Sequence, residues 1–438
     1  MLKRKFTDYL QSFLQREKHK ILLINGARQI GKTFLIRYVG QQLFTHYIEI
    51  DLRADKENLG HFAKVHSTED FYLQLGILYG NKLGPKEDTL IFLDEIQCYP
   101  HLLTMLKFLN QESRYTYIAS GSQLGVALSE STSVPLGSVE IQQMYPLDFE
   151  EFLWAMGCGT EAIGVMRNQF QQNLPLDETT HEYMLKMFRY YLLTGGLPDA
   201  VNIFVDNKNI TAIRTLQQNI HNLYGIDASQ YDLERKLKIR RIYDMIPSTL
   251  ENRKKRIVYQ NIENKKGKDR SDYADEFDYL IHSGIALEVK AISNPHFPLL
   301  ESQSKNLVKL YLNDVGLLTQ LLFDRNANAI LEDEHSINMG TVYESVVAQE
   351  LHAHAHRLHY YDNKKNGEVD FLIDDYGTLS VLPIEVKSGK NYKEHSAISH
   401  FISTPDYHIQ KGIVLNNQRD IRQVDKIFYM PIYYVMFL

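Results

Sequence analysis

The segment Gly26-Ala27-Arg28-Gln29-Ile30-Gly31-Lys32-Thr33 restricts the fold of this 438-residue chain more than any other feature. It matches the G-x-x-x-x-G-K-[ST] pattern at every defined position, between a short apolar run and a segment with helical spacing of apolar residues. A strand, a glycine loop and a helix in this order surround a phosphate with backbone N–H groups at a helix N-terminus. We expect the loop to bind nucleotide phosphates, with Lys32 at the β- and γ-phosphates and Thr33 on Mg²⁺. A chance glycine–lysine turn is the alternative.

A second apolar run, residues 90–94, ends in two adjacent carboxylates, Asp94 and Glu95. Ligands of parallel sheets bind at the carboxyl ends of the strands, where such a pair would lie. Asp94 suits a role in holding Mg²⁺, and Glu95 a role in polarising the attacking water of a phosphoryl transfer. The alternative is an Asp that caps a helix, followed by a solvated Glu.

A third run, residues 115–119, is followed by Ser120-Gly121-Ser122-Gln123. These polar groups are candidates for sensing the γ-phosphate, Ser122 first and Ser120 second, although an ordinary turn uses the same residue types. Apolar strands alternating with helical stretches predict an α/β fold, with a parallel sheet covered on both faces.

Beyond residue 145 the chain is expected to continue in further domains, since 438 residues exceed what one hydrophobic core usually organises. Long helical patterns fill residues 149–224, interrupted by a glycine–proline turn at 194–198. Short helices and two strand-like runs follow, a pattern compatible with a winged helix. The predicted strands of this part of the chain are residues 285–291, 307–312, 369–373, 382–386 and 432–436, and its last predicted helix is 341–352.

The predicted tail carries a second set of charged residues. Period two in a strand puts Glu385 and Lys387 on one face, and Asp370 comes from the strand before it. With Glu344 from the preceding helix, these side chains could bind Mg²⁺ and orient a water against a phosphodiester. Charged strands that simply face solvent are common and are the alternative.

Composition narrows the class of protein. An apolar fraction of 44% and a charged fraction of 23% are those of an ordinary globular protein. Two cysteines, Cys98 and Cys158, exclude a disulfide framework and a cysteine-rich zinc site. With neither a signal-peptide core nor a run of about 18 apolar residues, we expect a cytoplasmic protein with no membrane partner.

Positive charge gathers in one stretch of a chain whose net charge is −6. Such a surface would contact DNA phosphates without reading sequence, unless nearby acids balance it on a solvated face. The basic residues of this stretch are Arg235, Lys236, Lys238, Arg240, Arg241, Arg253, Lys254, Lys255, Arg256, Lys265, Lys266, Lys268 and Arg270.

Taken together, five segments resemble a large prokaryotic family of AAA-type ATPases that carry a C-terminal domain of unknown function. The resemblance implies an AAA-type P-loop core, expected in residues 1–155, a winged-helix-like domain, expected in 231–325, and a PD-(D/E)xK nuclease-like domain, expected in 326–438. The helical patterns between core and middle predict a helical lid or linker in residues 156–230. Many members have Gly-Arg where this chain has Gly137-Ser138, so the identity of any arginine finger stays open, with Arg28 as a substitute. The segments are 26–33, Leu93-Asp94-Glu95-Ile96-Gln97, Ala119-Ser120-Gly121-Ser122, Tyr145-Pro146-Leu147-Asp148-Phe149-Glu150-Glu151-Phe152 and Leu310-Tyr311-Leu312-Asn313-Asp314-Val315-Gly316-Leu317-Leu318.

Two functional hypotheses follow. In the first, an Mg²⁺-dependent ATPase uses its nucleotide state to control a DNA-directed, nuclease-like tail. In the second, a slow nucleotide-dependent switch or scaffold carries a tail that binds nucleic acid or protein without cutting. The preference for ATP over GTP rests on the resemblance, and a homo-oligomer is left open.

Overall fold

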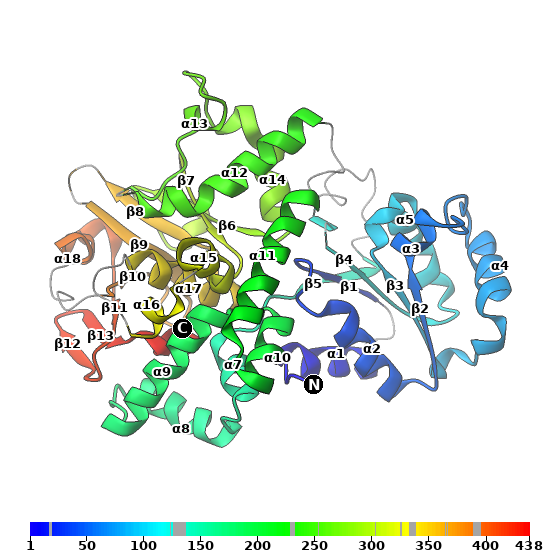
Figure 1. Ribbon diagram of the computed structural model, residues 1–438, viewed down its shortest axis with the longest axis horizontal. Coiled ribbons are helices and arrows are strands. Elements are labelled where there is room, and N and C mark those ends of the chain that lie inside the picture. Colours follow the sequence, from blue (N-terminus) through cyan, green and yellow to red (C-terminus); the bar gives the residue numbers. More distant parts are fainter. Residues whose placement is uncertain are drawn as a thin grey trace. The chain divides into compact units, whose positions relative to one another are not determined.

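The computed structural model describes residues 1–16, 20–122, 124–125, 137–227, 233–252, 254–302, 304–324, 326–332, 339–363, 365, 367–388 and 396–438. The chain forms two compact units (Figure 1). The first comprises Lys3–Tyr145 and Asp278–Gly284, and the second Pro146–Phe277 and Ile285–Leu438.

The first unit is built on a five-stranded sheet in the order β2-β3-β4-β1-β5, and every neighbouring pair in it is parallel. The predicted α/β fold is therefore confirmed. The register pairs Asp51 with Asp94 and Asn25 with Gly121, so these strands end at the same edge. The strands are β1 (Ile21–Asn25), β2 (His46–Asp51), β3 (Thr89–Asp94), β4 (Thr116–Gly121) and β5 (Val139–Gln143).

Helices cover both faces of this sheet, and consecutive residues of β1 and β3 are therefore buried. On one face, alternate strand residues pack with the apolar sides of α4 and α5. Helix α2 contacts β2 and β3, and the N-terminal helix α1 contacts α2. Local signals set the helix starts, such as the capping box of Ser67 and Asp70 at α4. The helices are α1 (Lys5–Arg16), α2 (Lys32–Leu43), α3 (Leu52–Glu57), α4 (Thr68–Tyr79) and α5 (Pro100–Glu112), with 3₁₀ turns η1 (Gly80–Lys82), η2 (Lys86–Asp88) and η3 (Ile96–Cys98).

The second unit begins with the helices expected between residues 149 and 224. They are α7 (Phe149–Ala155), α8 (Thr160–Gln171), α9 (Glu178–Thr194), α10 (Pro198–Asn207) and α11 (Ile210–Asp227). Further along the chain come α12 (Leu233–Glu251), α13 (Gln260–Glu263), α14 (Ala274–His282), α15 (Val315–Phe323), α16 (Ala327–Leu331), α17 (Met339–Ala353) and α18 (Ser396–Ser403). Most of α14 belongs to the first unit, since the division falls after Phe277.

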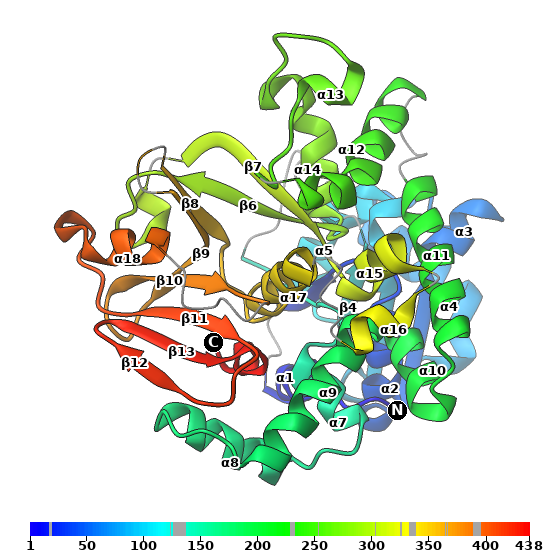
Figure 2. The same ribbon diagram turned by 60° about the vertical axis from the view of Figure 1, so that its left-hand side comes forward.

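The second unit also contains an eight-stranded mixed sheet in the order β12-β13-β11-β10-β9-β8-β6-β7 (Figure 2). Strands β6 and β7 come from the predicted winged-helix region, yet β6 pairs in parallel with β8 of the tail. The winged-helix assignment stays a prediction, and the structure adds that its two strands continue the sheet of the tail. The strands are β6 (Ala286–Ile292), β7 (Ser304–Leu312), β8 (His359–Asn363), β9 (Gly367–Asp375), β10 (Ser380–Val386), β11 (Gly412–Asn416), β12 (Arg422–Val424) and β13 (Ile427–Pro431).

One predicted element was wrong. Residues 432–436 were expected to form a strand, but Ile432–Phe437 is a 3₁₀ helix, η8, that directly follows β13. Pro431 ends the strand, because proline has no N–H group to donate to a ladder. The strand was predicted wrongly because all five residues are buried. Without an alternation of apolar and polar residues, the sequence does not distinguish a strand from a buried helical turn.

The glycine turn and the Asp314 segment, both part of the family resemblance, meet inside the second unit. Asp314 caps α15 by accepting from Leu317 N at 3.1 Å, and it accepts from Gly196 N at 2.6 Å. A Cβ at Gly195, where φ is 70°, would lie 2.1 Å from Asp314 Oδ1, and one at Gly196 would lie 2.0 Å from Leu147 O. These motif residues therefore have a structural role, which is to join α9, α15 and the Pro146-Leu147 segment.

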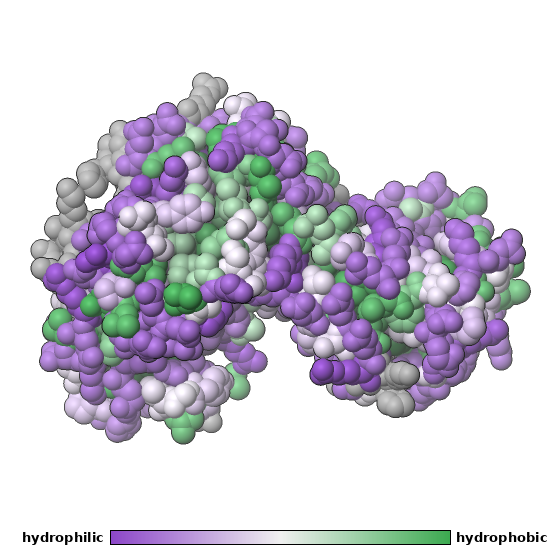
Figure 3. Space-filling model, turned by 90° about the horizontal axis from the view of Figure 1, so that it is seen from below, coloured by the Kyte–Doolittle hydropathy of each residue, from purple (hydrophilic) through white to green (hydrophobic). Residues whose placement is uncertain are grey.

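In the view of Figure 3 the surface of both units is mostly hydrophilic, with smaller apolar areas between. Within the described ranges, the helices are too short or too polar to cross a membrane.

Candidate functional site

The predicted phosphate loop connects β1 to α2. Gly31 caps α2 with φ at 90°, and no side chain of the described residues caps this helix end. The first N–H groups of a helix have no partner within the helix, so those of α2 are left for an anion. Gly26 is required at the other end of the loop, since a Cβ there would lie 2.4 Å from Met144 O. Gln29 also has a left-handed backbone, with φ at 65°.

Lys32 is buried within this loop. Its Nζ donates to Gly26 O and to Ala27 O, each at 2.8 Å. Burial lowers the pKa of Lys32 to about 8, against the opposing charges of Glu95 and Asp94. The lysine thus carries a partly desolvated charge whose hydrogen-bond partners among the described residues are two carbonyl groups, and an anionic phosphate would stabilise that charge.

Asp94, at the end of β3, lies directly beside the loop. Thr33 Oγ1 donates to Asp94 Oδ2 at 2.6 Å, and Ser120 Oγ donates to Asp94 Oδ1. Burial raises the pKa of the Asp94 carboxyl, while the two hydroxyls oppose the shift. The predicted Mg²⁺ ligands Thr33 and Asp94 are therefore in contact, although 61 residues separate them in sequence.

Glu95 and Ser122 are also brought together. Ser122 Oγ donates to Glu95 Oε2 at 3.1 Å, and Gln97 Nε2 donates to the same oxygen. Arg28 Nε in turn donates to Ser122 Oγ at 3.2 Å. Glu95 has a left-handed backbone with φ at 52°, a conformation that costs a residue other than glycine about 1–3 kcal/mol and that clusters at functional sites.

Two residues that position groups of the site, Arg4 and Gln97, were not predicted from the sequence. Arg4 Nη1 donates to Ile30 O at 3.1 Å, and Arg4 Nη2 donates to Tyr145 O at 2.6 Å. Nothing in the local sequence pattern around Arg4 indicates a partner 26 residues away. Gln97, the second, belongs to the Asp94–Gln97 segment of the resemblance, which was a usable signal.

The residues present fit a nucleotide with Mg²⁺. The uncapped helix end and Lys32 suit a triphosphate, and one carboxylate with one hydroxyl suits Mg²⁺, which keeps several waters and takes few protein ligands. No group of three His, Cys, Asp or Glu side chains in the described part of the chain is arranged to hold a metal. The protein side chains of this site would therefore not surround the metal ion by themselves, and phosphate oxygens of the nucleotide would complete the coordination of Mg²⁺.

In the tail, the structure brings the four predicted residues into one cluster. Asp370 of β9 accepts from Val386 N at 2.8 Å, and Lys387 Nζ donates to Glu385 Oε1 at 2.8 Å. Burial raises the pKa of Asp370, and the neighbouring charges of Glu344 and Glu385 raise it further. The three acids are therefore close enough to affect each other's ionisation.

Two buried or half-buried lysines in this cluster were not expected. Lys255 Nζ forms an ion pair with Glu344 Oε1. Lys309 is fully buried, with Nζ 2.6 Å from Glu368 Oε1 and 4.6 Å from the ring centre of Tyr360. A lysine inside the apolar run 307–312 was the available signal. Lys255 therefore balances Glu344, which was predicted to hold a metal, and Lys309 balances Glu368, which was not part of that prediction.

Other members of the basic stretch are also paired with acids. Ion pairs join Arg235 to Asp275, Arg240 to Asp244, Lys268 to Asp272 and Arg270 to Glu288, at distances between 2.5 and 3.5 Å. Arg253 lies outside the described residues. This balance favours the interpretation of a solvated face, and DNA binding stays a prediction.

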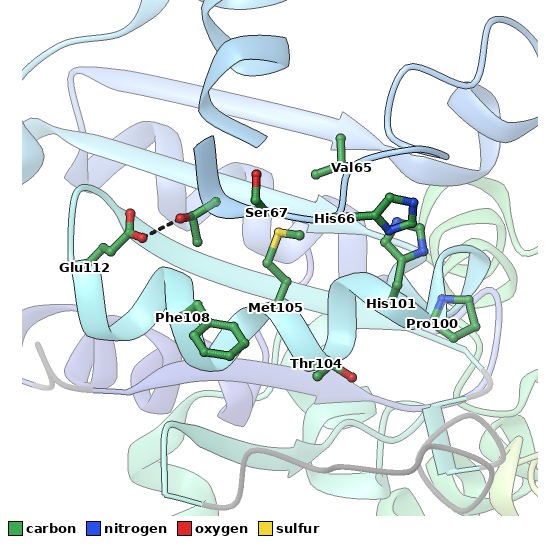
Figure 4. Close-up of a pocket in the computed structure, with 10 residues that line it drawn as sticks. Val65, His66, Ser67, Pro100, His101, Thr104, Met105, Phe108 and Glu112 are labelled. Atoms are coloured by element: carbon green, nitrogen blue, oxygen red, sulfur yellow. Dashed lines mark hydrogen bonds between the residues drawn. The ribbon is translucent and has the colours of Figure 1, made fainter. Parts of the chain in front are cut away.

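The first unit also has a cavity of about 690 Å³ between α4 and α5 (Figure 4). His66 and His101 face each other there with ring centres 5.8 Å apart, and Thr68 Oγ1 donates to Glu112 Oε1. None of its lining residues belongs to the phosphate loop or to the ends of β3 and β4. We therefore assign the nucleotide site from its chemistry and not from the size of a cavity.

The fold and the loop define the first unit as a P-loop domain of the AAA type. In agreement, residues 18–153 match a family described as "AAA domain". Residues 185–328 and 339–435 match two families described as "Domain of unknown function", DUF8612 and DUF4143. The chain thus carries an AAA domain followed by domains whose function is not known, as the resemblance implied.

An uncharacterised protein of Methanocaldococcus jannaschii is 22% identical over 446 residues, which cover 97% of this chain and 86% of that protein. Among solved structures, a Walker-type ATPase of Pyrococcus abyssi aligns with a TM-score of 0.44 and 15% identity, over 74% of this chain and 96% of that one. The Orc1 protein of Aeropyrum pernix, in complex with DNA, aligns with a TM-score of 0.33 and 14% identity, over 76% of this chain and 91% of that one.

Proposed function

We propose that the protein binds ATP with Mg²⁺ at the phosphate loop and hydrolyses it, and that its nucleotide state controls the tail. The observation that carries the proposal is the 2.6 Å hydrogen bond from Thr33 Oγ1 to Asp94 Oδ2, which joins the loop to the end of β3. Phosphoryl transfer depends mainly on positioning and charge stabilisation, for which these residue types are suited.

In this proposal each residue has one task. The N–H groups at the start of α2 and the Lys32 ammonium bind the phosphates, and Thr33 and Asp94 hold Mg²⁺, which offsets negative charge on the phosphate oxygens. Glu95 accepts a hydrogen bond from the attacking water. Gln97 and Ser122 hold its carboxylate, so rearrangement of their hydrogen bonds would accompany nucleotide binding.

The test is ATP binding and hydrolysis by the full chain, measured with and without DNA. Lys32→Ala should lose both binding and turnover, whereas Glu95→Gln should keep binding and lose turnover by about 100-fold or more. Lys107→Ala is the matched control, since Lys107 is an exposed lysine of α5. Turnover that Glu95→Gln leaves unchanged would contradict the assignment of the water-activating residue.

For the tail, the proposal is a DNA-directed nuclease-like module that uses Glu344, Asp370, Glu385 and Lys387. Mg²⁺-dependent cleavage of plasmid or single-stranded DNA should then be lost in Asp370→Ala and in Lys387→Ala, and kept in the exposed control Asp406→Ala.

One observation favours the second hypothesis, a tail that binds without cutting. Lys255 and Lys309 already neutralise acids of the cluster, which reduces its attraction for a metal ion. Absence of cleavage across DNA substrates and divalent metals, with Mg²⁺–ATP binding intact, would support that function and the slow switch that goes with it.

A further inference from the structure

A second cavity, of about 710 Å³, lies in the second unit between α11, α15 and α16. Its size falls within the range of about 300–1,000 Å³ that is typical of small-molecule sites. Hydroxyl and amide side chains line much of it, among them Thr211, Thr215, Gln218, Asn219 and Asn328. Neither proposed function uses this cavity.

Arg214 of α11 lines the cavity and is 95% buried, with 5% of its surface exposed. One of its terminal nitrogens is fixed: Nη1 donates to Gln217 Oε1, to Thr319 Oγ1 and to Gly316 O, at 3.1, 3.0 and 3.3 Å. Gln217 and Thr319 are themselves bonded to carbonyl groups at the end of α9. The guanidinium is therefore held in one orientation by its inner edge.

The opposite edge of the same guanidinium has no acceptor in the part of the chain that the structure describes. Nε and Nη2 of Arg214 are both buried and without a hydrogen-bond partner among the described residues, and so is Oε1 of Gln320, another residue that lines the cavity. Gln320 Nε2 is bonded to Gln218 Oε1 at 2.9 Å and to Asp324 Oδ1 at 3.3 Å, so this amide does not supply an acceptor to the arginine. A buried charged group with unmade hydrogen bonds is costly, and each such group calls for a partner.

The free atoms also have a specific geometry. Nε–H and Nη2–H point in parallel from one edge of a guanidinium and form the fork that binds two oxygens of a carboxylate or phosphate at once. Burial lowers the pKa of Arg214 to about 10, against the charge of Asp324, so the group is still a cation at neutral pH. Nε and Nη2 have no exposed surface in this structure, so binding at this edge requires neighbouring side chains such as Gln320 to change rotamer.

We propose that this cavity binds a small polar organic anion, whose carboxylate or phosphate group is held by Nε and Nη2 of Arg214. The hydroxyl and amide groups of the wall would bind the remaining polar atoms of the ligand, and Gln320 Oε1 would accept one of its N–H or O–H groups. This binding site is separate in sequence from the phosphate loop and from the acidic cluster of the tail.

The experiment titrates the full chain with inorganic phosphate and, separately, with sodium acetate, and follows binding by calorimetry and by the thermal unfolding midpoint. Sodium chloride at equal ionic strength is the control. All proteins carry Lys32→Ala, so that the phosphate loop does not contribute. Binding of phosphate, of acetate or of both is expected, and the stronger of the two identifies the chemical class of the anion.

Three further substitutions locate the binding. Arg214→Lys keeps the charge and removes the fork, and should weaken binding at least about tenfold. Thr215 is exposed on the cavity wall and its hydroxyl bonds only within its own helix, so Thr215→Glu and Thr215→Gln differ from each other chiefly in charge. Thr215→Glu should weaken binding about tenfold and Thr215→Gln less than about threefold.

Absence of binding by both anions would overturn the proposal and would indicate that the edge of Arg214 is satisfied by water. Equal binding in Thr215→Glu and Thr215→Gln would overturn it as well. The Thr215 pair decides the question even if Arg214→Lys fails to fold, because it leaves the hydrogen bonds of Arg214 unchanged.

Discussion

Acidic side chains in the two units are held in opposite ways. In the first unit, Asp94 is bonded to the hydroxyls of Thr33 and Ser120. In the second unit, Glu344 and Glu368 face lysines. A hydroxyl can turn its lone pairs to a metal ion and share the coordination, whereas an ammonium group repels a metal and neutralises the acid itself. Both clusters were predicted to hold Mg²⁺, and the comparison indicates that the first is far better suited to do so.

The largest effect is expected from removing the hydroxyl at Thr33. Thr33→Val keeps the shape of the side chain and should reduce Mg²⁺-dependent ATP hydrolysis by about 100-fold, because one metal ligand is lost. Turnover measured across Mg²⁺ concentrations checks this, with Thr33→Ser as the control that keeps the hydroxyl. Equal activity in Thr33→Val and Thr33→Ser would show that the Thr33 hydroxyl is not a metal ligand. The acids of the first unit would then not be better suited to Mg²⁺ than those of the tail on this ground.

In the tail, the expected effect is on stability. Lys309→Met leaves Glu368 without its ion-pair partner and removes one of the lysines near Glu344 and Asp370, and should lower the free energy of unfolding by about 3 kcal/mol. Urea denaturation measures the loss. The double variant Lys309→Met with Glu368→Gln should recover part of it, and a double variant no more stable than the single one would contradict the ion-pair explanation.

A third kind of buried acid, Asp314, is balanced by backbone N–H groups. Burial raises its pKa to about 6, although hydrogen bonds from Gly196 and Leu317 oppose the shift. Because this folded-state pKa exceeds the unfolded value of about 3.9, the contribution to stability is full below pH 3.9 and is lost as pH rises through 6. Stability should therefore increase by about 1 kcal/mol between pH 7 and pH 5.

The control for this pH effect is Asp314→Asn, which does not titrate. The difference between the two proteins in free energy of unfolding should vary with pH over that window. Parallel pH profiles would show that Asp314 is not the group responsible.

The smallest effect is expected at Ser122, which helps to hold Glu95. Ser122→Ala should reduce turnover by about three- to tenfold, as removal of one neutral hydrogen bond does. Ser120→Ala should instead raise the Mg²⁺ concentration needed for half-maximal activity, since Ser120 is bonded to Asp94. If both serines changed only the Mg²⁺ requirement, Ser122 would belong with the metal ligands.

Much of the first unit was predictable because its signals are short and contiguous. The loop lies within eight residues, and the acids and serines directly follow apolar runs. Parallel strands end at a common edge, so the proximity of Thr33, Asp94 and Ser120 followed from the sheet alone. The positive φ of Glu95 and its hydrogen bond to Gln97 did not follow, because backbone angles depend on tertiary packing.

In the second unit, fewer features could be predicted from the sequence. Four of its eight strands, β6, β7, β9 and β10, were predicted from the sequence, whereas β8, β11, β12 and β13 were not. The pairing of β6 with β8 was not predicted either, since strand order depends on long-range contacts. The aromatic run at 432–436 was misassigned for the related reason that full burial removes the period.

The sequence by itself determined a phosphate loop between a strand and a helix, acids and serines at strand ends, and the types of most elements, because each is encoded by neighbouring residues. Only the tertiary structure decided that Lys255 and Lys309 neutralise acids of the tail, and that Arg214, which lines a cavity, has a buried edge without a hydrogen-bond partner among the described residues. The physical reason is that ion pairing and burial join residues far apart in sequence, such as Lys255 with Glu344, 89 positions away, and Arg214 with Thr319, 105 positions away. No local pattern specifies which distant partner a buried charge will meet.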